Sequence, residues 1–161
     1  MKHDRFLLGI MIFIGVLVIA SVALFLARRE PQPYRAENTP EGVIHNYILA
    51  LQNRDYSRAY GYLADKDYKP TVDTFRQAFL IRTLDISNTA IQIGNTDLFA
   101  SDQAIVDLTV VYASGDPFSP GSNSNITASL EIQGGAWRIT NMPYPYWGWD
   151  WYQPTAVPVK P

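Results

Sequence analysis

The chain has 161 residues, a formal net charge of −2 at pH 7 and no cysteine, which excludes disulfide bonds, thiolate metal sites and cysteine nucleophiles. Outside one long apolar run, about 120 residues remain, enough for one domain. Residues 31–161 carry nine bases and thirteen acids. Such a mildly acidic domain is not expected to bind nucleic acid, because that affinity comes from Lys and Arg on phosphates.

Residues 6–26 read FLLGIMIFIGVLVIASVALFL, without a charge or an amide. As a helix this run spans about 31 Å, against a bilayer hydrocarbon core of about 30 Å, and it is long for a buried core helix. It predicts a transmembrane helix after a short N-terminal tail, residues 1–5. A cleaved signal peptide is the alternative, with Ser21 and Ala23 before the cleavage site. The run continues past them and exceeds the usual length of about 7–15 residues, so we expect a retained signal-anchor.

Residues 27–38, ARREPQPYRAEN, are interpreted as a tether to the domain. Pro31 and Pro33 favour an extended chain of about 3.1 Å per residue, which keeps the domain near the bilayer. The bases on the two sides of the apolar run nearly balance. The positive-inside rule therefore does not decide the orientation and leans slightly towards a cytoplasmic domain.

Three helices are predicted after the tether. Thr39, Pro40 and Glu41 suit the cap, the first position and the first turn of a helix. Asp55 should cap the second helix, and Thr71 the third. Apolar residues then recur at helical spacing: Val43, Ile44, Tyr47, Ile48 and Leu51; Tyr56, Ala59, Tyr60 and Leu63; Phe75, Ala78 and Phe79.

After Arg82 the apolar residues alternate, which is typical of strands with one buried face. The alternation is clear in residues 103–114 and 126–132, and residues 137–140 return after a tight turn at Gly134-Gly135. An earlier strand with a kink at Gly94 covers residues 91–99. About four antiparallel strands following three helices form an α+β domain.

The stretch TPEGVIHNYILALQNRDYSRAYGYLAD contains a capped helix, an N-x-D-Y turn and a helix with an RAY core. It resembles the opening of nuclear-transport-factor-2-like (NTF2-like) domains, which have a cystatin-like cone, and the later AWRIT is similar to their last strands. The resemblance covers about residues 38–141 and implies three helices packed into a curved sheet, often around a pocket; we assign the domain to residues 39–142. The chain also resembles membrane-anchored bacterial members, which implies an extracytoplasmic domain.

The sequence shows no pattern that predicts catalysis. It contains no Gly-rich phosphate loop, no G-x-S-x-G and no HExxH, and its acids are scattered. Asp107, Glu131 and Arg138 fall on the strand face opposite the aliphatic residues. His45 is the remaining candidate base of the domain, and a lone His on a helix is usually a half-buried polar residue. We therefore expect no catalytic residue, no cofactor and no metal.

The C-terminal tail, residues 143–161, contains the segment PYPYWGWDWYQP, in which six of the nine residues 144–152 are aromatic. Six rings could cover about 900–1,500 Å², more than the largest apolar patch of an ordinary monomer, about 300–600 Å². Packing on the same domain, docking to a partner or a second copy, contact with lipid headgroups and stacking on a flat ligand all stay open. If the segment is extended, its three tryptophans share one side. The candidate binding residues are Tyr146, Trp147, Trp149, Trp151 and Tyr152.

Together these features predict a single-pass membrane protein that contacts lipid through residues 6–26. Its domain is predicted to be a non-catalytic interaction or scaffold module at the membrane surface, with a protein partner or with self-association. Two alternatives remain. The cone could hold a small apolar ligand, or the protein could be an enzyme that uses His45 or a buried tyrosine.

Overall fold

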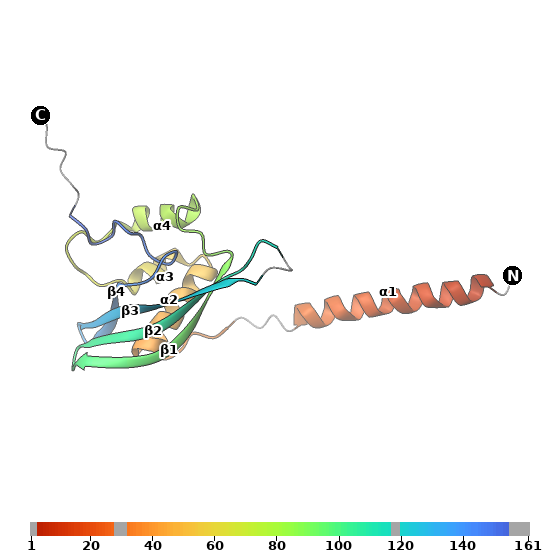
Figure 1. The fold of residues 1–161 in the computed structure, drawn as a ribbon, viewed down its shortest axis with the longest axis horizontal. Coiled ribbons are helices and arrows are strands. Elements are labelled where there is room, and N and C mark those ends of the chain that lie inside the picture. Colours follow the sequence, from red (N-terminus) through yellow and green to blue (C-terminus); the bar gives the residue numbers. More distant parts are fainter. Residues whose placement is uncertain (1–2, 28–31, 117–119, 155–161) are drawn as a thin grey trace, which may run out of the picture. The chain divides into compact units, whose positions relative to one another are not determined.

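The computed structural model describes residues 3–27, 32–116 and 120–154. The chain divides into two units, Met1–Pro33 and Tyr34–Pro161, which are considered separately here (Figure 1). Parts of the predicted N-terminal tail, tether and C-terminal tail lie outside the described residues, namely residues 1–2, 28–31 and 155–161.

The first unit contains the helix α1, His3–Ala27. Within it, Phe6–Phe25 is long and apolar enough to cross a membrane, and none of this stretch is buried against other parts of the protein. Length and composition of this kind suit a membrane anchor and a signal sequence alike.

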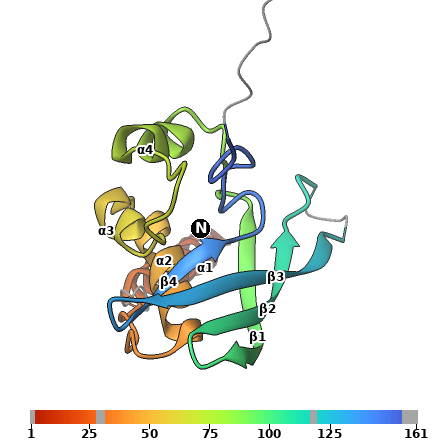
Figure 2. The ribbon, with the colours of Figure 1, turned by 90° about the vertical axis from the view of Figure 1, so that its left-hand side faces the viewer.

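The second unit has the α+β order that the sequence predicts. Three helices come first, and four strands follow (Figure 1). The helices are α2 (Pro40–Gln52), α3 (Tyr56–Gly61) and α4 (Val72–Leu80), and the strands are β1 (Thr89–Ala100), β2 (Gln103–Tyr112), β3 (Ser122–Gln133) and β4 (Ala136–Asn141). The strands form one antiparallel sheet in the order β1-β2-β3-β4 (Figure 2). The prediction of an α+β domain, with three helices before a four-stranded antiparallel sheet, is confirmed.

The three predicted helix caps are confirmed. The side-chain oxygens of Thr39, Asp55 and Thr71 each accept a hydrogen bond from a backbone N–H three residues on, at 3.1 Å. The helix α3 ends earlier than the spacing of its apolar residues predicts. Leu63 instead lies beside Ile139 of β4 in a parallel bridge, so the chain after α3 extends the sheet at that edge.

The buried face of the sheet follows the predicted alternation. Ala104, Val106, Leu108 and Val110 of β2 are buried, and the helix α2 contacts β1, β2 and β4 on this face. The register of β1 and β2 shifts after Ile93, next to the predicted kink at Gly94. The core therefore lies between one face of the sheet and the helices.

Candidate functional site

The aromatic C-terminal segment folds back onto the domain beside α4 (Figures 1 and 2). Tyr146, Trp147 and Trp151 are 0%, 6% and 5% exposed, Tyr152 is half-buried, and Trp149 is 87% exposed. The segment is not extended, so the arrangement with three tryptophans on one side does not form. The chain turns at Gly148, whose carbonyl accepts a hydrogen bond from the Trp151 N–H at 3.2 Å, so neighbouring tryptophans point in opposite directions.

Trp151 is the centre of an aromatic cluster that joins this segment to α4. Its ring centroid lies 5.1 Å from that of Phe75, 5.2 Å from that of Trp147 and 6.3 Å from that of Phe79. Trp147 in turn stacks on Tyr152 at 5.6 Å and 11°. Tilted and edge-on contacts of this kind are favourable for aromatic rings, and each buried ring removes about 150–250 Å² from water.

Hydroxyl groups fasten the segment to the rest of the domain. The Tyr47 hydroxyl donates to the Tyr146 carbonyl at 2.6 Å, and the Tyr146 hydroxyl lies 3.0 Å from Thr89 Oγ1. The Tyr152 hydroxyl donates to the Ala64 carbonyl at 2.6 Å. Burial raises the pKa of Tyr47 and of Tyr146, so both hydroxyls stay protonated at neutral pH.

An open groove of about 440 Å³ lies between α4 and the turn at Gly148. Trp149, Ile81 and Ala78 line it, and Trp149 and Ile81 are both strongly exposed. Asp73 and Asp150 are the charged residues of its described lining. This groove, called the Trp149 groove below, combines an exposed aromatic ring with apolar side chains and two carboxylates.

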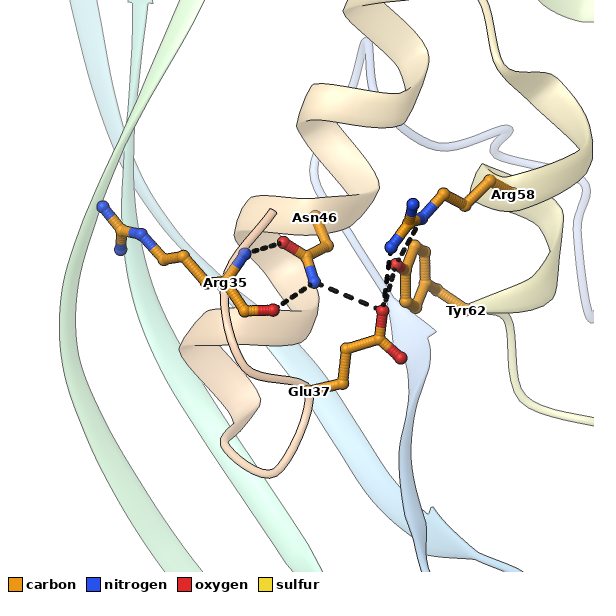
Figure 3. Close-up of polar contacts among 5 residues, drawn as sticks. All are labelled: Arg35, Glu37, Asn46, Arg58 and Tyr62. Carbon is orange, nitrogen blue, oxygen red and sulfur yellow. Dashed lines mark hydrogen bonds and ion pairs between the residues drawn. The ribbon is translucent and has the colours of Figure 1, made fainter. Parts of the chain in front are cut away.

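A polar cluster that the sequence analysis did not identify holds the chain at the start of the second unit (Figure 3). Asn46 of α2 is fully buried; its Oδ1 accepts from the Arg35 N–H at 2.7 Å, and its Nδ2 donates to the Arg35 carbonyl at 2.9 Å. The Ala36 carbonyl lies so close to Gly42 that an added Cβ would be 2.0 Å from it. The sequence signal was an amide among the mostly apolar residues 43–51 of the predicted helix. Residues 34–38, assigned from the sequence to the tether, thus fold with the domain.

Glu37 completes this cluster (Figure 3). Its carboxylate accepts from the Tyr62 hydroxyl at 2.7 Å and pairs with Arg58 at 3.2 Å. The Arg58 guanidinium also lies 3.4 Å from the centroid of the Tyr34 ring, a cation–π contact. The hydrogen bond from Tyr62, followed by the effect of Arg58, holds the pKa of Glu37 below its ordinary value.

The other predicted candidates do not join these sites. His45 is half-buried on α2. Asp107 is exposed on the outer face of β2, and Glu131 pairs with Lys66. Among residues 3–27, 32–116 and 120–154, no group of three His, Asp or Glu side chains is arranged to hold a metal ion.

We predict that Gly148→Ala destabilises the domain by about 1–3 kcal/mol, because the new Cβ would lie 2.4 Å from Nε1 of the buried Trp151 ring. Thermal unfolding of the full chain in detergent, with near-ultraviolet circular dichroism of the tryptophans, measures this. Gly61→Ala is the matched control, since a Cβ there meets open space. Equal stability of the two variants would show that Trp151 moves aside without cost.

We predict that Asn46→Ala lowers the free energy of unfolding by about 1–3 kcal/mol, because it leaves the Arg35 N–H and carbonyl without partners. Trypsin should then cleave after Arg35 faster than in the wild type. Asn53→Ala, at an exposed position at the end of α2, is the control. An unchanged cleavage rate at Arg35 would argue against a holding role for Asn46.

We predict that the contacts of Glu37 make stability depend on pH. A lowered folded-state pKa means that this stability is present above the unfolded-state pKa and is lost as the pH falls through the folded-state value. Between about pH 5 and pH 3, the wild type should lose more stability than Glu37→Gln. Tyr62→Phe should weaken the dependence as well, and identical pH profiles for all three proteins would contradict the assignment.

No family model matches the chain, and no curated protein is similar to it in sequence. Solved structures similar to it include a SEC-C motif-containing protein from Rhodopseudomonas palustris (12% identity, 66% of this chain and 79% of that one, TM-score 0.49). An NTF2-like protein of unknown function from Shewanella oneidensis has 13% identity over 61% of this chain and 88% of its own, with a TM-score of 0.46. A cystatin-fold protein from Novosphingobium aromaticivorans has 11% identity over 66% and 97%, with a TM-score of 0.44. These similarities carry no information on function.

Proposed function

We propose that this chain is a single-pass membrane protein whose folded domain is a non-catalytic interaction module, with the Trp149 groove as its contact surface. The apolar helix Phe6–Phe25 supports the anchor. Residues 28–33 separate α1 from the folded unit, and six residues reach at most about 22 Å. The domain would thus act close to the bilayer, on the extracytoplasmic side that the sequence resemblance implies.

The observation that carries this proposal is the exposure of Trp149. Its neighbours Trp147 and Trp151 are buried, and they hold the turn that presents Trp149 to solvent. Tryptophan, with tyrosine and arginine, is among the residue types that contribute most to protein–protein binding energy. The apolar side chains of the adjacent groove would enlarge the contact.

The arrangement of ionisable groups supports a non-catalytic role. Proton transfer needs an acid or base of tuned pKa beside the reacting atom. Among the described residues Asn46 is the buried polar side chain, and it binds the backbone of Arg35. The buried tyrosines Tyr47 and Tyr146 have raised pKa values, which makes them hydrogen-bond donors rather than bases.

The charge of the groove favours a protein partner over lipid. Asp73 and Asp150 would be repelled by anionic headgroups, whereas an apolar segment that carries a Lys or Arg would complement them. A small apolar ligand inside the cone is less well supported, because Tyr146, Trp151 and Phe75 occupy the core.

We predict that Trp149→Ala weakens binding to the partner at least about tenfold and leaves the unfolding temperature unchanged, since the side chain is exposed. A photo-cross-linking residue at position 149 of the full chain, in its own membrane, identifies the partner whose affinity is then measured. Phe99 is the matched control, because its ring is 68% exposed on β1.

A cross-link from position 149 that is absent from position 99, together with the loss of affinity in Trp149→Ala, supports the proposal. Cross-links to lipid alone, or unchanged affinity with normal folding, would overturn it. A cross-link to a second copy of the chain would show that the partner is the protein itself and that the surface serves self-association.

A further inference from the structure

A second open groove, of about 310 Å³, lies where α2 ends, α3 begins and the chain runs from α4 to β1. Its apolar lining includes the buried side chains of Leu51, Phe79 and Leu84. Its polar lining includes Arg54 and Arg82. The groove, called the arginine groove below, therefore offers an apolar base beside two positive charges.

The two arginines have an unfavourable backbone conformation. Arg54 and Arg82 both have φ of 59°, in the left-handed region, and each follows the residue that ends a helix, Asn53 for α2 and Ile81 for α4. Glycine is the usual residue at this position, because a Cβ atom disfavours positive φ. Two helices thus end with arginine where local backbone preference favours glycine, and both arginines line the same groove.

A cation near the carbonyl end of a helix is favourable, but this does not explain the left-handed conformation of Arg54 and Arg82. A Lys or Arg in the last helical turn would give the same interaction without positive φ. Among the described residues, neither Arg54 nor Arg82 forms an ion pair. The acid in the described lining, Asp85, accepts the Ser87 N–H at 2.9 Å, and its charge also attracts Arg82, so one acid faces two arginines. The groove retains an excess of positive charge, and violations of local preference of this kind concentrate at functional sites.

We propose that the arginine groove binds a small amphipathic anion. The carboxylate or phosphate of this ligand would bind the guanidinium groups of Arg54 and Arg82, which match the geometry of both anions. Its apolar part would cover Leu51, Phe79 and Leu84. A volume near 310 Å³ is at the lower end for ligand sites and limits the apolar part to one ring or a short chain. Leu84 lines both grooves, but neither arginine lines the Trp149 groove, so binding of the anion does not depend on the proposed contact surface.

The test uses the full chain in nanodiscs of neutral phosphatidylcholine, with labelled leucine and isoleucine methyl groups observed by NMR. The probe is 4-phenylbutyrate, and its uncharged amide, 4-phenylbutanamide, is the matched control. We expect the acid to shift the methyl resonances of Leu51, Leu84 and Ile86, which line the groove, and to bind at least tenfold more tightly than the amide. A parallel sample in anionic nanodiscs separates a free anion from a lipid headgroup.

The variants Arg54→Gly and Arg82→Gly distinguish a ligand role from a structural one. Each should weaken binding of the acid at least tenfold and leave the unfolding temperature equal or higher, because glycine relieves the left-handed conformation. Tyr68→Gly is the control, since Tyr68 also has positive φ, at 61°, and does not line the groove. If Arg54→Gly fails to fold, Arg54→Asn is used in its place, because asparagine tolerates the left-handed conformation.

Selective binding of the acid that both arginine variants lose and Tyr68→Gly keeps supports the proposal. Equal binding of acid and amide would overturn it, as would unchanged binding in the two arginine variants. Methyl shifts that occur only in anionic nanodiscs would assign the groove to a lipid headgroup and would also overturn binding of a free anion.

Discussion

The packing of Trp151 against Phe75 and Phe79 is the contact on which the second unit most depends. The helix α4 has nine residues, and a helix of this length is marginal in water unless its apolar face is covered. Trp151 covers that face from a segment more than seventy residues away in sequence, and Trp147 and Tyr152 stack behind it. Because Gly148 has no side chain, the chain can turn here in close contact with the Trp151 ring.

This use of the aromatic residues also defines the surface that remains available. Since Tyr146, Trp147 and Trp151 are buried, a partner can reach Trp149, Tyr144, which is 61% exposed, and to a smaller extent Tyr152. A binding surface built from one exposed ring and a shallow groove is small, so its affinity would come from a few strong contacts rather than from area. The membrane anchor that we propose would favour binding by raising the local concentration of the domain beside a membrane-bound partner.

Polar contacts hold the start of the folded unit, in addition to the packing of Tyr34 against the core. Asn46 binds both backbone groups of Arg35, and Glu37 is held by Tyr62 and Arg58. The buried amide of Asn46 favours a single arrangement of the chain, because any alternative leaves its donor or acceptor without a partner; Glu37 and Arg58 add contacts at the surface. The cluster therefore sets where the connection to α1 leaves the domain.

The sequence by itself determined the elements, because their causes are local: Thr39, Asp55 and Thr71 cap helices within three residues, and residues 103–112 alternate between the two faces of a strand. It also identified the aromatic segment as unusual and predicted that some of its six rings are covered, since six rings exceed the apolar patch of an ordinary monomer. Only the tertiary structure decided that Trp149 stays outside while Trp147 and Trp151 are buried, because that depends on the turn at Gly148 and on the space that α4 leaves for Trp151. The same holds for the contacts of Asn46 and for the groove that Arg54 and Arg82 share, because both arise where separate elements meet and no local pattern records them.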